Sequence, residues 1–365
     1  MRLLITLLAL LALVVPAPAG PTLERMIGQM IVVGFVGTEP LALNVLQTRQ
    51  QIAQGRIGGV MLLGRNVSNE ARTRRLIASL KTAARDLPIL VAVDQEGGRV
   101  ARLRWHTGVT PFPSAAHVAQ SLEPGKAAAL YERGARDLAS WGFNLNFGPV
   151  ADVNVNPLSP AIGRLGRSFS SEPERVARYA RAFVHGHRRA GVLTALKHFP
   201  GHGSSNGDSH HGTTDITATW STQELLPFAD LIATGHADIV MTGHLLHRGY
   251  EAALPATLSH RIVTGLLREE LGFDGVVIAD DLQMGAVRRH FSEEAASVAA
   301  IRAGVDVLLF SRDRVVDPTL VERVTAAVAQ AARKDPRLRE RVRQSFQRIV
   351  ALKARLGEED RAALR

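Results

Sequence analysis

The residues best suited to chemistry lie in one glycine-rich segment, which runs KHFPGHGSSNGDSHHG from Lys197 to Gly212. Within it, Asp208 and His210 are two residues apart, a spacing at which a loop can fold the carboxylate onto one imidazole nitrogen. The other nitrogen is then free to donate and accept a proton near neutral pH. The segment therefore predicts a general acid/base pair.

The same segment could instead bind a metal ion, because its four imidazoles are enough ligands for zinc. These are His198, His202, His210 and His211. A metal-dependent barrel hydrolase usually carries an HxH pair on its first strand, where this chain has Gly34-Phe35-Val36-Gly37. Its HxH, His185-Gly186-His187, falls in a helical stretch. We therefore expect no metal and no cofactor, and keep a metal-dependent hydrolase as the alternative.

The scaffold that must position these residues is indicated by eight short apolar runs separated by helix-like stretches. Runs such as ILVAV and VVIA are nearly continuous hydrophobics, as expected for parallel strands buried on both faces. The eight runs are Gln29 to Phe35, Gly59 to Leu63, Ile89 to Val93, Asn144 to Phe147, Val192 to Leu196, Ile239 to Met241, Val276 to Ala279 and Val305 to Phe310. This pattern favours a closed (β/α)₈ barrel, a TIM-like α/β fold, over an open doubly wound sheet.

Helix signals complete the predicted scaffold. Ser171 with Glu174 is a capping-box pattern for a helix reaching Ala190, and Ser221 with Glu224 is one for a helix reaching Thr234. From about Val316, apolar spacing predicts two extra C-terminal helices. No linker or repeat interrupts the chain, so we expect a single barrel domain over residues 20–365.

In such a barrel the chemistry lies at the C-terminal ends of the strands. Acids, bases and a lysine follow five of the predicted strands. They are Asp94 after strand 3, Asp152 after strand 4, Lys197 and His198 after strand 5, His244 after strand 6, and Asp280 with Asp281 after strand 7. Because these ends meet on one face of a barrel, the sequence predicts a site assembled from several strands.

Five segments resemble the family 3 glycoside hydrolases, in the branch that acts on β-N-acetylglucosaminides. They are DQEGGRVARL from Asp94, IGRLGRSFS from Ile162, KHFPGHG from Lys197, DSH from Asp208 and LGFDGVVIADDLQM from Leu271. The resemblance covers essentially the whole barrel, and the DSH motif is specific to the acetamido-sugar branch. It implies a retaining β-N-acetylhexosaminidase that hydrolyses terminal non-reducing β-linked N-acetylglucosamine from cell-wall fragments or chito-oligosaccharides.

The resemblance also implies roles for individual residues. Asp280 matches the nucleophile that forms a covalent glycosyl-enzyme, His210 the general acid/base, and Asp208 the residue that orients it. For Asp281 we expect a structural role on the other side of the strand. The positions that match sugar-contacting residues of the family are Asp94, Arg102, Arg167, Lys197 and His198.

Other functions remain open at this stage. The acetamido group of the substrate could act as the nucleophile, with the Asp280-Asp281 pair in support. Phosphate could replace water as acceptor, since a histidine acid/base tolerates it. A non-catalytic exported sugar-binding protein is a further alternative, although such a protein has no need of Asp280, Asp208 and His210 together.

The N-terminal residues 1–19 read as a signal peptide, with basic Arg2, an apolar stretch from Leu3 to Val15 and the sequence Ala17-Pro18-Ala19 before Gly20. The apolar stretch is shorter than the ~20 residues that a spanning helix needs. We therefore expect an exported protein, periplasmic or secreted, with no stable membrane insertion.

The net charge of +10 raises the question of an anionic partner. Only five of the 44 basic residues are Lys, the Arg residues are spread along the chain, and aromatic residues make up 5%, so we do not expect nucleic-acid binding. The absence of cysteine excludes disulfides and thiolate chemistry. The expected partner is a carbohydrate, bound by a monomer.

Overall fold

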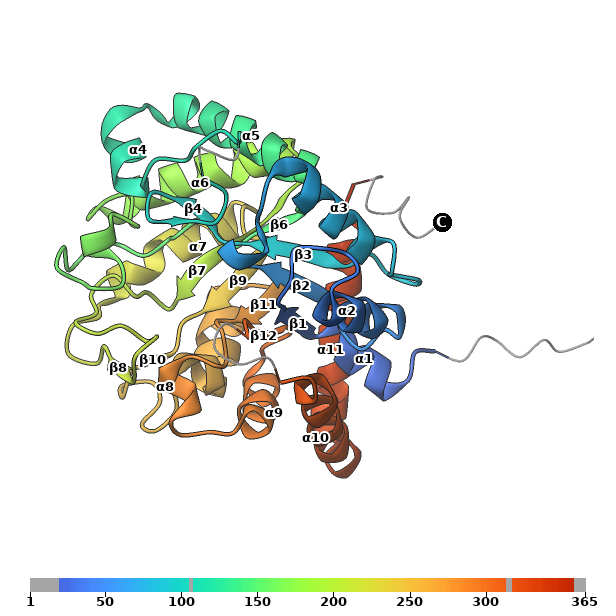
Figure 1. Ribbon diagram of the computed structural model, residues 1–365. Helices are drawn as coiled ribbons and strands as arrows, with labels where there is room; N and C mark the ends of the chain where they lie inside the picture. The colour runs from blue at the N-terminus through green and yellow to red at the C-terminus, as the bar shows by residue number, and fades with distance from the viewer. Residues whose placement is uncertain (1–19, 105–107, 313–316, 358–365) are drawn as a thin grey trace, which may run out of the picture.

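The computed structural model describes residues 20–104, 108–312 and 317–357, so the predicted signal peptide lies outside the described residues. Eight parallel strands form the centre, and helices surround them (Figure 1). The strands are β1 (Ile31–Gly34), β2 (Gly59–Leu62), β3 (Leu90–Val93), β6 (Leu145–Asn146), β7 (Leu193–Phe199), β9 (Ile239–Thr242), β11 (Val276–Ala279) and β12 (Leu308–Phe310). Each predicted apolar run supplies one of them.

The strands follow one another around the barrel in sequence order. β12 pairs with β1, and an isolated bridge between Ile278 and Val307 joins β11 to the β12 segment. The backbone N–H of Ala279 donates to the carbonyl of Val307 (2.9 Å), which closes the ring at this point. The predicted TIM-like barrel is therefore confirmed.

Two strand boundaries differ from the prediction by three residues: β12 begins at Leu308 and not at Val305, and β7 continues to Phe199 and does not end at Leu196. All seven of its residues are buried. Lys197 and His198 consequently lie within the strand, near its C-terminal end.

The helices that cover the barrel and its rim are α1 (Leu23–Gln29), α2 (Leu43–Ala53), α3 (Glu70–Lys81), α4 (Ala115–Ser121), α5 (Pro124–Trp141), α6 (Pro173–Arg189), α7 (Leu226–Ala233), a π-helix (Arg261–Glu270), α8 (Gly285–Arg288), α9 (Glu293–Ala303), α10 (Leu320–Lys334) and α11 (Pro336–Lys353). Two short pairs of strands flank the barrel, β4 (Gln95–Gly97) with β5 (Val100–Ala101) and β8 (Thr214–Asp215) with β10 (Leu245–Leu246). None of the helices in the described ranges is long and apolar enough to cross a membrane.

Both predicted capping boxes are wrong. Helix α6 begins at Pro173 with Glu172 as its N-cap, because proline is preorganised for the first helical position and needs no acceptor for an N–H. Ser221 precedes a 3₁₀ turn, Thr222–Leu225, without a side-chain cap bond. The Glu224 side chain turns instead toward the loop after β7, where it accepts from the backbone of Gly203.

The two predicted C-terminal helices are present as α10 and α11, and they pack against α1 and α9 (Figure 1). Near the end of α11, the buried ammonium of Lys353 donates to Gln29 Oε1 (2.7 Å) and to the carbonyl of Gly58 (2.8 Å). These acceptors lie just before β1 and β2. The contacts tie the end of α11 to the N-terminal mouth of the barrel, opposite the predicted site.

Candidate active site

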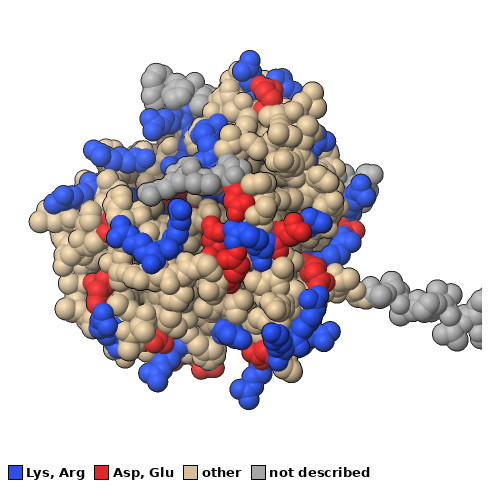
Figure 2. Space-filling model, turned by 60° about the horizontal axis from the view of Figure 1, so that its bottom comes forward, with Lys and Arg blue, Asp and Glu red and all other residues tan. Residues whose placement is uncertain are grey.

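One cavity of about 760 Å³ opens at the C-terminal ends of the strands, and all eight predicted site residues line it. They are Asp94, Arg102, Arg167, Lys197, His198, Asp208, His210 and Asp280. On the face shown in Figure 2, acidic side chains gather near the centre and basic side chains stand among them. The barrel thus brings together residues from β3, β7 and β11 and from the long loops after β6 and β7.

An ion-pair network forms one wall of the cavity. The ammonium of Lys197 donates to Glu96 (2.6 Å) and to Asp94 (3.1 Å). Arg167 donates to Glu96 through Nε (2.8 Å) and Nη2 (2.7 Å), and Arg102 donates to Asp94 (2.8 Å). Burial alone raises the pKa of both carboxyl groups, but the neighbouring cations outweigh it and hold each pKa below its usual range. All five side chains are therefore charged and held in a fixed arrangement that can bind sugar hydroxyls.

His198 is oriented by a buried carboxylate. Its Nδ1 donates to Asp152 (2.7 Å), and its Nε2 lies 3.3 Å from Nη2 of Arg167. The other oxygen of Asp152 accepts from the backbone N–H groups of His198 (3.0 Å) and His202 (2.8 Å). Burial raises the pKa of Asp152, but His198 and these donors lower it overall. Asp152 therefore fixes the tautomer of His198 and leaves Nε2 toward the cavity wall formed by Arg167.

Asp280 lies directly after β11. Burial alone raises its pKa, but the imidazoles of His244, His198 and His210 and the N–H of Asp281 hold that pKa at about 2. The N–H of Asp281 donates to Asp280 Oδ1 (2.8 Å). Asp280 is consequently an anion at neutral pH, without an arginine or lysine among these neighbours to neutralise it by direct contact.

Asp281 also lines the cavity, where its carboxylate is bound by a residue just after β12. Its carboxylate accepts from the hydroxyl of Ser311 (2.5 Å) and from the backbone N–H groups of Ser311 (3.0 Å) and Gln283 (3.1 Å). These bonds join the end of β11 to the end of β12. The contacts agree with the structural role expected for this residue.

Asp208 and His210 form the predicted pair. Asp208 Oδ1 accepts from Nδ1 of His210 (2.7 Å) and from its backbone N–H (2.9 Å). Burial raises the pKa of Asp208, but these two bonds lower it below its usual value. The His210 side chain is 62% exposed, so its Nε2 is accessible to a ligand and to water.

Sequence reasoning listed Asp152 and His244 among the polar strand ends without giving them a role, and it overlooked Glu96. Glu96 follows Asp94 by two residues, so the alternation of an extended chain turns both toward the same side. That spacing was the signal available for Glu96. His244 follows β9, and its Nε2 lies 2.9 Å from the carbonyl oxygen of Asp281. Its imidazole is one of the groups that lower the pKa of Asp280, the predicted nucleophile.

The histidines of the loop after β7 do not converge on a common point. His202 Nδ1 lies 2.7 Å from Ser205 Oγ, and its Nε2 lies 3.3 Å from Ser209 Oγ. Within residues 20–104, 108–312 and 317–357, no group of three or more potential protein ligands is placed to hold a metal ion. The loop is built from hydrogen bonds to serines and a carboxylate.

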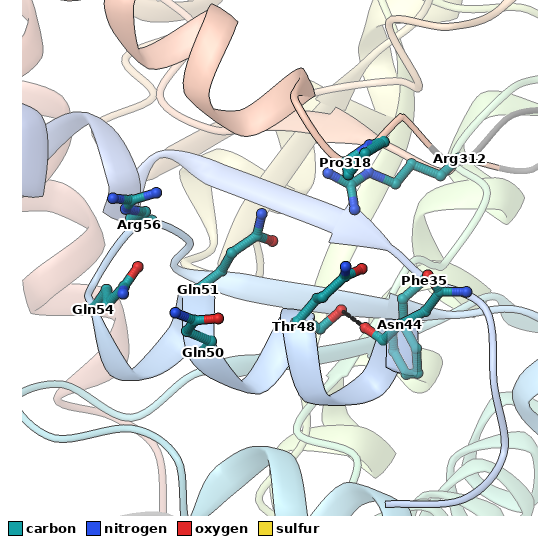
Figure 3. Close-up of a pocket in the computed structure, with 10 residues that line it drawn as sticks. Phe35, Asn44, Thr48, Gln50, Gln51, Gln54, Arg56, Arg312 and Pro318 are labelled. Carbon is teal, nitrogen blue, oxygen red and sulfur yellow. Dashed lines mark hydrogen bonds between the residues drawn. The ribbon is translucent and has the colours of Figure 1, made fainter. Parts of the chain in front are cut away.

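A second cavity, of about 230 Å³, lies between α2 and the residues Arg312 and Pro318 (Figure 3). Amide side chains of α2 line it, among them Asn44 and Gln51. It contains none of the predicted site residues. The cavity at the C-terminal ends of the strands is therefore the candidate active site.

Comparison with protein families decides the assignment. The sequence profile of the glycosyl hydrolase family 3 N-terminal domain matches residues 22–352. The chain belongs to glycosyl hydrolase family 3. The predicted family resemblance is thus confirmed.

Individual members of family 3 show the same relationship. Beta-hexosaminidase A of Pseudoalteromonas piscicida is 34% identical, over 92% of this chain and 62% of its own length. A β-N-acetylglucosaminidase structure from Paenibacillus sp. str. FPU-7 has a TM-score of 0.84 and 35% identity, covering 92% of this chain and 62% of that chain. A β-N-acetylhexosaminidase structure from Beutenbergia cavernae has a TM-score of 0.84 and 33% identity, covering 92% of this chain and 99% of that chain. This family 3 chain therefore spans less than two thirds of the first two relatives and nearly all of the third.

Proposed function

We propose that this family 3 protein is a retaining β-N-acetylhexosaminidase that hydrolyses terminal non-reducing β-linked N-acetylglucosamine. The observation that carries the proposal is one cavity lined by both an ionised Asp280 and the Asp208–His210 pair. The names of the similar proteins, a beta-hexosaminidase and a β-N-acetylglucosaminidase, support the same substrate class. Cell-wall fragments and chito-oligosaccharides are the natural substrates that we propose.

In the first step, an oxygen of Asp280 attacks the anomeric carbon and forms a glycosyl ester. The bond to the leaving-group oxygen breaks as Nε2–H of protonated His210 donates its proton to that oxygen. Asp208, which accepts from Nδ1 of His210, stabilises the imidazolium that this step requires. In the second step, neutral His210 takes a proton from water, the water oxygen attacks the anomeric carbon, and Asp280 leaves as a carboxylate.

The ion-pair network suits a neutral sugar. Its two carboxylates and three cations already neutralise one another except for one positive charge, so a ligand need not supply charge. Carboxylates of Asp94 and Glu96 can accept from sugar hydroxyls, and Arg102 and Lys197 can donate to them. Because these groups are already held by one another, little ordering is required when the sugar binds.

A panel of p-nitrophenyl β-glycosides, assayed with and without inorganic phosphate, tests the proposed activity. We expect the N-acetylglucosaminide to be cleaved with a much higher kcat/KM than the glucoside. The product should be free N-acetylglucosamine in both buffers. A sugar 1-phosphate as product would indicate phosphorolysis, and binding of N-acetylglucosamine without cleavage of any glycoside would favour the sugar-binding alternative.

Chelation distinguishes the glycosidase from a metal-dependent hydrolase. Since the proposed nucleophile and proton donor are both side chains, dialysis against EDTA should leave kcat unchanged within error. Loss of turnover that zinc restores would contradict this and assign the histidine loop to a metal.

We also propose that the protein is exported, on the basis of the pattern in residues 1–19.

A further inference from the structure

Glu224, in the 3₁₀ turn Thr222–Leu225, is fully buried beneath the loop that follows β7. Its Oε2 accepts from the backbone N–H groups of Gly203 (3.0 Å) and Ser204 (3.3 Å). A Cβ atom on Gly201 would lie 2.7 Å from Cβ of Glu224, so the backbone of the loop packs directly against this side chain. We call residues 201–204 the stem of the loop.

A second buried carboxylate also holds the stem. Asp152 Oδ1 accepts from the backbone N–H of His202 (2.8 Å). Three successive stem amides, those of His202, Gly203 and Ser204, therefore donate to two buried carboxylates. The two carboxylates also repel one another. Burial is the main cause of the raised pKa of Glu224, about 7, and the negative charge of Asp152 raises this pKa further.

The stem is connected to the catalytic pair through the imidazole of His202. Nδ1 of His202 contacts Ser205 Oγ (2.7 Å) and Nε2 contacts Ser209 Oγ (3.3 Å). Ser209 lies between Asp208 and His210 in the sequence. We call residues 208–210 the tip of the loop. A displacement of the stem is thus transmitted to the tip through side-chain contacts as well as through the backbone.

The tip itself rests on α8. Backbone N–H groups of Gly285 and Ala286 donate to the carbonyls of His210 (3.2 Å) and Ser209 (3.1 Å). These two amides belong to the segment that follows Asp280 after β11. The position of His210 relative to Asp280 therefore depends on both supports, the α8 amides at the tip and the two carboxylates at the stem.

We propose that Glu224 is a positioning residue for proton transfer: by binding the stem amides, it holds His210 where Nε2 can reach the leaving-group oxygen. This inference rests on the proposed glycosidase function. A buried carboxylate carries a desolvation cost that a leucine of similar size avoids, but a leucine would leave two backbone N–H groups without their acceptor. The carboxylate therefore suits the control of loop geometry better than it suits packing alone.

The test compares kcat/KM for two aryl N-acetylglucosaminides, one with a good leaving group (p-nitrophenol) and one with a poor one (p-methoxyphenol). Glu224→Ala should reduce kcat/KM on the poor leaving group roughly 10- to 100-fold more than on the good one, since only the poor one needs the proton from His210. Glu224→Gln retains an oxygen that can accept from both stem amides. For Glu224→Gln, the ratio of the two kcat/KM values should therefore stay within about threefold of the wild-type ratio.

Asp238 provides a matched control, because it is a buried carboxylate at the opposite end of the barrel, bound by Arg188 (2.6 Å) and Arg355 (2.6 Å). Asp238→Ala should lower Tm without changing the ratio of the two kcat/KM values. If Glu224→Ala does not fold, Glu224→Asp takes its place, and its retracted carboxylate should still give a selective loss of about threefold or more.

An equal loss on both substrates, or no loss, in folded Glu224→Ala or in the Glu224→Asp variant that replaces it would overturn the positioning role. The proposed function fails separately, for example if wild-type protein cleaves neither N-acetylglucosaminide. The two failures are therefore distinguishable within the same assay.

Discussion

Asp280→Asn should lower kcat on p-nitrophenyl N-acetylglucosaminide by roughly 10⁴-fold. The amide has nearly the same shape as the carboxylate but is a poor nucleophile and cannot stabilise the positive charge that develops at the anomeric carbon. The pKa of Asp280, held at about 2 by nearby imidazoles against the effect of burial, means that the reactive anion is present throughout the neutral range. Steady-state kinetics on purified protein, with Tm measured in parallel, checks this expectation.

Asp281→Asn is the matched control, since it makes the same chemical change one residue along the chain. Asp281 binds Ser311, so its loss should lower Tm and reduce kcat by less than about tenfold. The opposite pattern, with Asp281→Asn inactive and Asp280→Asn active, would mean that the two carboxylates exchange roles.

His210→Ala should reduce kcat/KM by about 10²- to 10³-fold on substrates with poor leaving groups and far less on activated aryl glycosides. Only the former need a proton delivered as the glycosidic bond breaks. With an activated substrate, hydrolysis of the glycosyl ester becomes the slow step because water lacks its general base. Azide, which needs no base, should then restore turnover and yield a glycosyl azide detectable by mass spectrometry.

Two further variants serve as comparisons for His210→Ala. Asp208→Ala should show the same selectivity in a milder form, because the imidazole remains but loses its orienting bond. His211→Ala, at the exposed neighbouring histidine, should leave both substrate classes unchanged. Equal losses on both classes for His210→Ala would mean that His210 binds the sugar and is not the acid.

The barrel and the gathering of its strand ends could be predicted because hydrophobic runs buried on both faces report directly on strand order. Once the order is known, the topology alone places Asp94 and Asp280 on one face, although they are far apart in the sequence. The hydrogen bond between Asp208 and His210 in the loop could also be predicted, because the two residues are only two positions apart in the sequence.

What could not be predicted depends on contacts between distant segments. Arg167 and Glu96 are 71 residues apart, and neither residue's local sequence specifies the partner. The local sequence pattern assigned Glu224 to a capping box. In the folded chain its carboxylate instead accepts hydrogen bonds from the backbone amides of Gly203 and Ser204. At Glu224, buried backbone donors from another segment therefore overrode the local pattern.

Covalent trapping tests the central claim most directly. Incubation with a 5-fluoro N-acetylglucosaminyl donor, which slows hydrolysis of the intermediate, should add one fluorosugar to the protein, and peptide mapping should place it on Asp280. Asp280→Asn should carry no label. An unlabelled Asp280 peptide together with tight binding of an oxazoline-type inhibitor would contradict the account, because the acetamido group of the substrate would then be the nucleophile.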